Sequence, residues 1–320
     1  MVRTAPVGIT RLGEKLVAWR DKSGVVHVLE DRCPHRGSPL SLGWNLGDRI
    51  ACWYHGLQVG PDGRVLRVPA VPNCPLEGKT EVRRYQTREI AGAIFAYFGD
   101  KKAPDLALPE QLTAPEFDHF LAFAFWRCNY RYVMDNTLDP MHGAYLHRHS
   151  HSMTEGAAQA KMRVRPTPTG FIFEKQDQRE VSLDWSEFGD TNWHWMRTDT
   201  PYQKYAGPGG KFWIVGSWTP VDAENCVVFF WRIRKVQGWQ RAAWRFLYKM
   251  RLEGLHWDVL EQDRAMLENF PQDARTREFL YQHDVGLARM RRHLERKAAA
   301  QLVAGRNGKT GAAVRHPRVT

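Results

Sequence analysis

Short apolar runs separated by turn residues dominate the first hundred residues of the chain. Each run has the length of a β-strand, and the breaks between runs carry Gly, Ser or Asp. The pattern therefore predicts a β-rich N-terminal domain, with a hairpin at Asp62-Gly63. The runs lie at residues 15–19, 25–29, 49–52, 65–68 and 93–98, and the turns at Ser23-Gly24, Asp62-Gly63 and Gly99-Asp100.

The pattern changes after residue 100. Residues 101–116 hold three prolines and no periodic spacing, which is typical of a linker. Strand-like and helix-like stretches then follow, and the polar, glycine-containing end of the chain is expected to be disordered. Strands are predicted at residues 120–129, 170–174, 212–218 and 226–234, and helices at 130–147, 239–268 and 275–300. The predicted division is a first domain at residues 1–104, a linker at 105–116, a second domain at 117–300 and a disordered basic tail at 301–320.

Composition adds limits on the class of protein. The chain has 320 residues, 43% of them hydrophobic and 25% charged, which is enough to bury the cores of two domains. It contains no 18-residue apolar stretch and no apolar signal-peptide core near the N-terminus, so we expect neither membrane insertion nor secretion. Five cysteines are too few for a disulfide scaffold and favour thiols or metal ligands in a reducing cytoplasm.

The net charge is basic, but it is concentrated at one end. The chain carries +11, and residues 286–320 contribute +8 of it through nine Lys or Arg and one Glu. Because the rest is nearly balanced, nucleic-acid binding is disfavoured. A solvated helix followed by a basic tail explains the charge, and the same charge would steer an acidic redox partner.

Cysteine and histidine recur in two short segments of the first domain. Cys33 and His35 are separated by one residue, and Cys52 and His55 follow with two residues between them. Two Cys and two His suit a tetrahedral zinc ion or a [2Fe–2S] cluster whose irons take two Cys and two His respectively. The Cys-x-His spacing is tight for one tetrahedral ion and favours loop-tip ligands that reach different irons.

These two segments, Cys33-Pro-His-Arg-Gly37 and Cys52-Trp-Tyr-His-Gly56, resemble the Rieske iron–sulfur proteins. The resemblance implies that Cys33, His35, Cys52 and His55 hold a [2Fe–2S] cluster. Rieske proteins of the respiratory complexes carry two further loop cysteines that form a disulfide, and these segments have none. The loops therefore resemble the branch that serves oxygenases and their ferredoxins.

A second group of metal-ligand residues lies in the second domain. His142 and His147 with a nearby carboxylate suggest a 2-His-1-carboxylate site, which suits ferrous iron and leaves positions open for oxygen. Five residues correspond to about 140° around an ideal helix, so a shared metal requires a distorted or broken helix. Pro140 and Gly143 make such a distortion plausible.

This segment resembles the active-site motif of the Rieske non-haem iron oxygenases, with Asn136, Asp139, His142 and His147 in the motif positions. The resemblance implies that both histidines bind the catalytic iron. It implies that Asp139 carries electrons from the Rieske cluster of a neighbouring subunit to this iron. It also implies that Asn136 contacts the ligands rather than the metal.

The third iron ligand is expected on the helix at residues 251–270. Its apolar stripe is interrupted at Asp263, and a carboxylate on a buried face is costly unless it is paired or binds a metal. Asp263 is therefore the predicted ligand, and the segment Glu261-Gln262-Asp263 also resembles the family segment that supplies it. Asp258 is the second choice, and an Asp263 that is simply salt-bridged to an Arg is the alternative.

Other candidates are assigned to ordinary roles. His149 and His151 are expected at the surface or the rim of a pocket, and His194 in a strand, where it could still line that pocket. Cys74, Cys128 and Cys226 have no ligand-spaced partners and are expected to be buried thiols. Cations that could meet an acidic substrate are Arg163, Arg165, Lys175, Arg179 and Arg197, each of which has a solvated strand residue as its simpler interpretation.

The resemblance to the Rieske oxygenases implies an α+β fold class. An all-β Rieske [2Fe–2S] domain would precede an α+β helix-grip catalytic domain that has an antiparallel sheet and a long C-terminal helix. The chain length matches the compact branch that has only α subunits, and the family implies a homotrimer. No G-x-G-x-x-G segment follows a strand, so electrons would come from a separate flavin or iron–sulfur reductase or from a ferredoxin.

Three functions are carried forward. The first is the terminal oxygenase component of a multicomponent system that uses O2 to hydroxylate a small aromatic compound, including aromatic acids. The second is an O- or N-demethylating monooxygenase that releases formaldehyde. The third, from another class, is a Rieske electron-transfer protein without oxygenase activity. Expected cofactors are one [2Fe–2S] cluster and one mononuclear Fe(II) per subunit.

Overall fold

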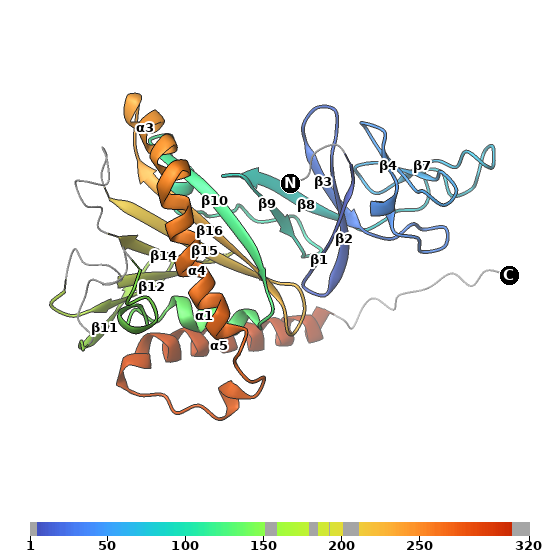
Figure 1. The fold of residues 1–320 in the computed structure, drawn as a ribbon. Coiled ribbons are helices and arrows are strands. Elements are labelled where there is room, and N and C mark those ends of the chain that lie inside the picture. The colour runs from blue at the N-terminus through green and yellow to red at the C-terminus, as the bar shows by residue number, and fades with distance from the viewer. Residues whose placement is uncertain (1–4, 151–158, 179–184, 192, 201–210, 309–320) are drawn as a thin grey trace.

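The fold consists of an all-β part followed by a larger part built on a single wide sheet (Figure 1). The structure, a computed structural model, describes residues 5–150, 159–178, 185–191, 193–200 and 211–308. An all-β N-terminal domain and an antiparallel sheet with helices in the second domain confirm the predicted α+β class.

The N-terminal part contains a five-stranded antiparallel sheet in the order β1-β2-β3-β8-β9. Its second strand is buried on both faces, with Val17 and Trp19 in one core cluster and Leu16 and Ala18 in another. This explains why that run is continuously apolar rather than alternating. The strands are β1 (Val7–Arg11), β2 (Glu14–Arg20), β3 (Val26–Glu30), β8 (Arg84–Ile90) and β9 (Ala93–Tyr97).

A smaller four-stranded sheet carries the rest of this part in the order β4-β5-β6-β7. The predicted hairpin at Asp62-Gly63 joins its last two strands. Gly63 has φ +88°, and a Cβ there would lie 2.1 Å from the carbonyl oxygen of Val82, so only glycine fits. The strands are β4 (Trp44–Asn45), β5 (Ile50–Ala51), β6 (Gln58–Val59) and β7 (Val65–Arg67).

The second part is built on a seven-stranded antiparallel sheet in the order β10-β16-β15-β14-β13-β12-β11. Its first strand starts and ends three residues before the prediction, because Asn129 caps the following helix by accepting a hydrogen bond from the Arg131 N–H (2.9 Å). The strands are β10 (Phe117–Trp126), β11 (Met162–Thr167), β12 (Gly170–Lys175), β13 (Trp185–Asp190), β14 (His194–Thr200), β15 (Phe212–Pro220) and β16 (Cys226–Lys235).

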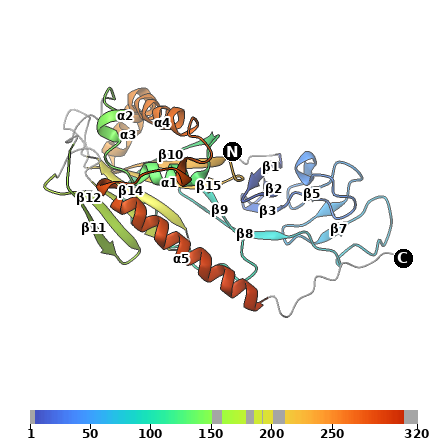
Figure 2. The same cartoon turned by 90° about the horizontal axis from the view of Figure 1, so that it is seen from below.

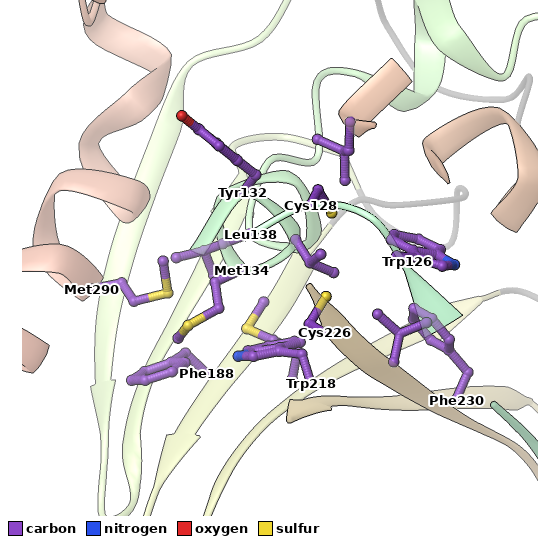
Figure 3. Packing of buried hydrophobic residues seen from close by; sticks show 14 of the residues in the cluster. Trp126, Cys128, Tyr132, Met134, Leu138, Phe188, Trp218, Cys226, Phe230 and Met290 are labelled. Atoms are coloured by element: carbon purple, nitrogen blue, oxygen red, sulfur yellow. The ribbon is translucent and has the colours of Figure 1, made fainter. Parts of the chain in front are cut away.

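Helices cover one face of this sheet (Figures 1 and 2). The core between them includes Met134 of the first helix and Leu138 at its C-cap, Phe188 and Trp218 of the sheet, and Met290 of the last helix (Figure 3). The predicted helix at 239–268 is split by a π-helical turn at Tyr248–Leu252. The helices are α1 (Tyr130–Thr137), α2 (Gly143–Leu146), α3 (Trp239–Leu247), α4 (Glu253–Leu267) and α5 (Val285–Gly308).

The last helix is displaced from its predicted position at 275–300. It begins at Val285, after Asp284 has accepted a hydrogen bond from the Tyr281 N–H (2.9 Å), and the preceding segment has no buried face, since Phe279 is 96% exposed. It runs to Gly308, so residues 301–308 are helical, where disorder was expected from residue 301. Residues 309–320 lie outside the described residues.

The two parts are joined by backbone hydrogen bonds and by a shared core. Leu12 and Gly13, in the β1–β2 turn, donate to the carbonyls of Pro220 and Val221 (2.8 Å each). Trp231 of β16 donates from Nε1 to the Ala91 carbonyl (2.8 Å). A further core cluster includes Ala93 of the first part and Trp195, Val215 and Trp231 of the second, with Phe95 packed against it.

Among the helices that the structure describes, none combines the length and apolar character needed to cross a membrane.

Candidate metal centres

The two Cys-His segments form loops with the same backbone pattern. In each, the cysteine N–H donates to the carbonyl five residues later (2.8 Å in both loops). A glycine four residues after the cysteine, Gly37 or Gly56, donates back to the cysteine carbonyl (2.8 and 2.9 Å). Both glycines have positive φ, +77° and +70°, a conformation that favours glycine. The sequence thus builds the same ligand-bearing turn twice.

These loops place two buried thiols below two exposed imidazoles. Cys33 and Cys52 are buried, whereas His35 and His55 are exposed, with ring centroids 4.8 Å apart. Burial, together with the neighbouring Cys52 sulfur, raises the pKa of the Cys33 thiol to about 11, although the backbone N–H groups of His35 and Arg36 donate to its sulfur and oppose the rise. Two thiols and two imidazoles from facing loops fit a [2Fe–2S] cluster.

A single zinc ion fits this arrangement less well. A tetrahedral ion needs its ligand atoms close together, because zinc–ligand bonds are only about 2.0–2.3 Å long. Among the described residues, the one group of three or more metal-ligand side chains with all ligand atoms within 4.8 Å is elsewhere in the chain. The ligand atoms of the two Cys-His loops are spaced more widely, as binding to two iron ions instead of one zinc ion requires.

That other group consists of His142, His147 and Asp263. The two histidines lie at the two ends of α2, a single turn that follows the break after α1. The predicted distortion between them is therefore present, and it brings the rings to a T-shaped contact with centroids 5.1 Å apart. Asp263, from α4, lies with Oδ1 3.6 Å from His142 Nε2 and 3.3 Å from His147 Nε2.

The environment of His147 fits a metal ligand. Its side chain is fully buried, and its Nε2 has no hydrogen-bond partner among the described residues. Its Nδ1 lies 2.9 Å from Gln262 Oε1, an acceptor, so Nδ1 carries the proton and Nε2 keeps its lone pair. Burial lowers the pKa of His147, but the adjacent Asp263 carboxylate and Gln262 outweigh burial and leave the pKa raised. A buried lone pair facing a carboxylate and a second imidazole suits a ferrous ion.

Two further contacts hold this group in place. Asn136 Nδ2 donates to Asp263 Oδ1 (3.0 Å). The His142 Nδ1 contacts the backbone carbonyl of Asp139 and lies 3.8 Å from its carboxylate Oδ2, while the other carboxylate oxygen accepts from the Met141 N–H (2.8 Å). The Asp139 side chain remains 35% exposed and so connects a buried ligand to the protein surface.

The alternatives to Asp263 find no support. Asp258 is exposed on the other side of α4. Within the described residues, the ion-pair contacts of Asp263 are to the two histidines and to no Arg or Lys, so the salt-bridge interpretation fails. Gln262 was missed by the sequence reasoning, although its place next to Asp263 could have indicated it.

The remaining candidates have structural partners or lie elsewhere. His149 is exposed and contacts Arg148, and His151 is outside the described residues. His194 binds Asp190 (2.9 Å), a carboxylate that also binds His293 and Lys297 of α5. Cys128 and Cys226 are buried as expected, whereas Cys74 is only half-buried. Among the cations, Arg163 and Arg165 pair with Glu174, Arg197 pairs with Glu187, Lys175 is buried, and Arg179 is outside the described residues.

Two family models match the chain and cover most of it. The Rieske [2Fe–2S] domain model matches residues 1–86, and the vanillate O-demethylase oxygenase C-terminal domain model matches residues 126–300. Two ligand sets on one chain, in a β domain followed by an antiparallel sheet, define a Rieske-type protein with a second metal site. The chain belongs to the Rieske non-haem iron oxygenase family, in the group with a vanillate O-demethylase type of C-terminal domain.

Individual relatives agree with this assignment. The 3-chlorobenzoate-3,4-dioxygenase oxygenase subunit of Comamonas testosteroni is 28% identical over 71% of this chain and 54% of its own length. The vanillate O-demethylase oxygenase subunit of a Pseudomonas species (strain HR199) is 36% identical over 45% of this chain and 41% of its own length. The chain thus spans about half the length of the curated relatives it matches.

A solved structure supports the fold. Dicamba monooxygenase bound to dicamba superposes with a TM-score of 0.73 over 93% of this chain and 95% of the other, at 21% identity. Family membership implies a [2Fe–2S] cluster and a mononuclear iron, and both donor sets in this chain fit those groups.

Proposed function

We propose that this chain is the oxygenase component of a multicomponent Rieske oxygenase. The observation that carries the proposal is the group of His142, His147 and Asp263, in which the buried His147 Nε2 faces the other two side chains and has no hydrogen-bond partner among the described residues. A Rieske electron-transfer protein would have no use for this group. Its presence on the same chain as the Rieske loops therefore favours an oxygenase over the electron-transfer alternative.

Each site residue is proposed to act through its position. Cys33, Cys52, His35 and His55 would hold the cluster, and His142, His147 and Asp263 the iron. When bound, the cluster supplies single electrons and the ferrous ion supplies oxygen activation. We keep the proposed division into a Rieske domain at residues 1–104, a linker at 105–116 and a catalytic domain that continues from residue 117.

The chain's own groups orient these ligands and control their protons. Gln262 keeps the proton of His147 on Nδ1, which leaves Nε2 available on the buried side. Asn136 donates to one oxygen of Asp263 and so fixes how the carboxylate faces the histidines. Asp139, with its half-exposed carboxylate beside His142, is proposed as the connection to the cluster of a neighbouring subunit. The burial of His147 and Asp263 keeps bulk water from the reaction.

The proposed substrate class is a small aromatic acid. The relatives above are named for 3-chlorobenzoate and vanillate, and the structural relative is bound to dicamba. Ring hydroxylation is the first candidate reaction. Demethylation of a methoxy or methylamino group, with release of formaldehyde, is the second, because the matching C-terminal family model is that of vanillate O-demethylase.

The proposed partners follow from the exposed cluster ligands. His35 and His55 are exposed next to Trp53 and Tyr54, which are 62% and 55% exposed, so this tip is suited to contact another protein. We propose a separate reductase or ferredoxin as the electron donor, a homotrimer that brings this tip to Asp139 of a neighbour, and action in the cytoplasm. No role in nucleic-acid or membrane binding is proposed.

Metal analysis and product analysis test the proposal together. An oxygenase should hold about three irons per two labile sulfides, whereas a Rieske electron-transfer protein should hold equal numbers. The protein is then incubated with a reductase, NADH and oxygen against benzoates and their methyl ethers. Formaldehyde with loss of a methyl group identifies demethylation, and a gain of two oxygens and two hydrogens identifies dihydroxylation. Equal iron and sulfide in the purified protein would refute the oxygenase assignment.

A further inference from the structure

Arg232 is a buried cation on the strand next to the edge strand β10 of the seven-stranded sheet. It lies on β16 and is 2% exposed. Its neighbour Phe230, on the same strand face, belongs to the core beneath the helices, whereas Trp231 and Ile233 belong to the core shared with the N-terminal part. Because strand residues alternate between faces, the Arg232 side chain lies on the helix side of the sheet, next to Ile214 of β15.

This guanidinium has no counter-ion of its own in the part of the chain that the structure describes. Its Nη1 donates a hydrogen bond to the carbonyl of Phe230 (3.2 Å), and its Nε has no hydrogen-bond partner among residues 5–150, 159–178, 185–191, 193–200 and 211–308. Within the described residues it forms no ion pair with a carboxylate. Tyr248 and Glu253 interact with it electrostatically, but the Glu253 carboxylate binds Lys249 (2.7 Å) at the surface.

Such an arrangement is costly for the protein unless an anion joins it. Burial lowers the pKa of Arg232, yet an arginine in a protein stays protonated. A buried charge is ordinarily paired, and unused guanidinium N–H groups are strong donors for planar anions. Three other cations of this part of the sequence, Arg163, Arg165 and Arg197, have carboxylate partners. Arg232 differs from these arginines because its guanidinium has no carboxylate partner among the described residues, and a binding site for an anion requires such a cation.

The apolar cluster that contains Phe230, the strand neighbour of Arg232, continues to the helix that carries Asp263. Phe230, Leu260 and the partly buried Trp257 and Ile214 belong to one apolar cluster. Leu260 lies on α4 one turn before Asp263, on the same buried side of the helix. Arg232 lies over the Phe230 ring, 5.4 Å from its centroid, so a ligand bound to Arg232 would meet this apolar cluster.

We propose that Arg232 is the anchor for the carboxylate of an aromatic acid substrate. This inference rests on the proposed function and deepens it, since it assigns the residue that selects acids over neutral aromatics. The guanidinium and the carboxylate form a bidentate pair, and the ring packs between Phe230, Trp257 and Leu260. A sulfonate offers the same charge with a different shape, and the test distinguishes the two.

Binding to the purified holoprotein under anaerobic conditions tests the anchor directly. Titration calorimetry compares benzoate, 3-chlorobenzoate, 4-methoxybenzoate and toluene-4-sulfonate with the methyl esters of the three carboxylates. We expect the wild type to bind carboxylates more tightly than esters. Arg232→Gln should weaken carboxylate binding by ~100-fold and leave ester binding unchanged, and Arg232→Lys should restore part of the loss. Arg251→Gln, which removes an exposed guanidinium from the neighbouring π-helical turn, is the matched control and should change nothing.

Thermal unfolding provides a second readout that a purely structural role would not produce. Without ligand, Arg232→Met should melt no lower than the wild type, because it removes a buried charge that has no counter-ion. Adding 3-chlorobenzoate should raise the melting temperature of the wild type and not that of the variant. A large loss of stability in Arg232→Met without ligand would show that Arg232 is a structural residue and would overturn the proposal.

The outcomes separate this inference from the proposed function. Carboxylate binding that depends on Arg232 without any oxygenated product would support the anchor and count against the oxygenase assignment. Oxygenation of aromatics with equal activity in Arg232→Gln would keep the oxygenase and overturn the anchor. Equal wild-type affinity for acids and esters, or tighter binding of the sulfonate than of every carboxylate, would also overturn it. If Arg232→Gln loses the Rieske spectrum, the wild-type ratio of acid to ester affinity decides alone.

Discussion

The two metal-ligand groups of this chain are assembled in opposite ways. The proposed Rieske ligands come from two short loops, each closed by its own backbone hydrogen bonds and a positive-φ glycine. The His142, His147 and Asp263 group joins α2 to α4, and more than a hundred residues of chain lie between its histidines and its carboxylate. The first group depends on local sequence, whereas the second depends on how the helices pack on the sheet. Substitutions should therefore affect the two groups independently.

The largest expected effect is the loss of the mononuclear iron in Asp263→Ala. Removing the carboxylate leaves two histidines, so iron occupancy and oxygenase activity should fall to background while the Rieske absorption stays unchanged. Iron and sulfide analysis with the visible spectrum measures both groups. Asp258→Ala, on the exposed side of the same helix, is the control and should retain iron. Full iron occupancy in Asp263→Ala would refute the assignment.

The reciprocal change is Cys52→Ser. It removes a buried thiol from one Rieske loop, so the cluster spectrum and labile sulfide should disappear while the second group still binds Fe(II) added to the purified protein. Turnover should also stop, because electrons no longer reach the iron. Cys74→Ser, a half-buried thiol outside the loops, should behave as the wild type. Loss of Fe(II) binding in Cys52→Ser would show that the two groups are coupled.

A smaller effect is expected from Gln262→Leu. The leucine cannot accept the His147 Nδ1 proton, so the ring loses the contact that fixes its orientation and tautomer. Iron affinity should fall about 10–100-fold, with the Rieske spectrum unchanged. Equilibrium binding of Fe(II) to the apo site measures it. Glu261→Gln, on the preceding residue, removes a surface pair with Arg264 and should leave the affinity as it was.

The mildest test is the pH dependence of iron binding. Because Asp263 and Gln262 outweigh burial and raise the pKa of His147, a proton competes with iron for Nε2. Below that raised pKa the apparent affinity should fall about tenfold per pH unit for one displaced proton. In the metal-free protein, the folding stability depends on pH with the opposite sign. The raised pKa of His147 stabilises the folded state fully below pH 6.5, and this stabilisation is lost as pH rises through the pKa of His147 in the folded protein. A flat affinity between pH 5 and 8 would contradict the exchange.

The same contrast explains what the sequence could predict. The sequence could predict Rieske ligands because the spacing of each Cys-His pair lies within a single loop. Asp263 could be chosen over Asp258 because it occupies a gap in the apolar stripe of its helix, and that stripe indicates the buried side of the helix. The place of Gln262 next to Asp263 was a signal, but its contact with the ring of a histidine 115 residues away depends on how the helices pack.

Strand β16 is buried on both faces, and this prevented the sequence from predicting the position of Arg232. Alternate residues of β16 belong to different cores, with Phe230 under the helices and Trp231 against the N-terminal part, so the strand has no polar face. The alternation that would mark Arg232 as an inward-facing charge is therefore absent from the sequence. The start of α5 was missed for another reason, because its cap depends on Asp284 and the apolar residues before it, such as Phe279, are exposed.

The seam between the two parts of the chain has a consequence for protein engineering. Phe95 of the Rieske part packs against Trp193 and Trp231 of the catalytic sheet, and the β1–β2 turn is bonded to the β15–β16 connection. A Rieske domain grafted from a relative would have to match these rings and carbonyls, or it would leave aromatic surface open to water. The domains of this family member are therefore poor interchangeable modules, and chimeras should succeed only when the residues on both sides of the seam are exchanged together.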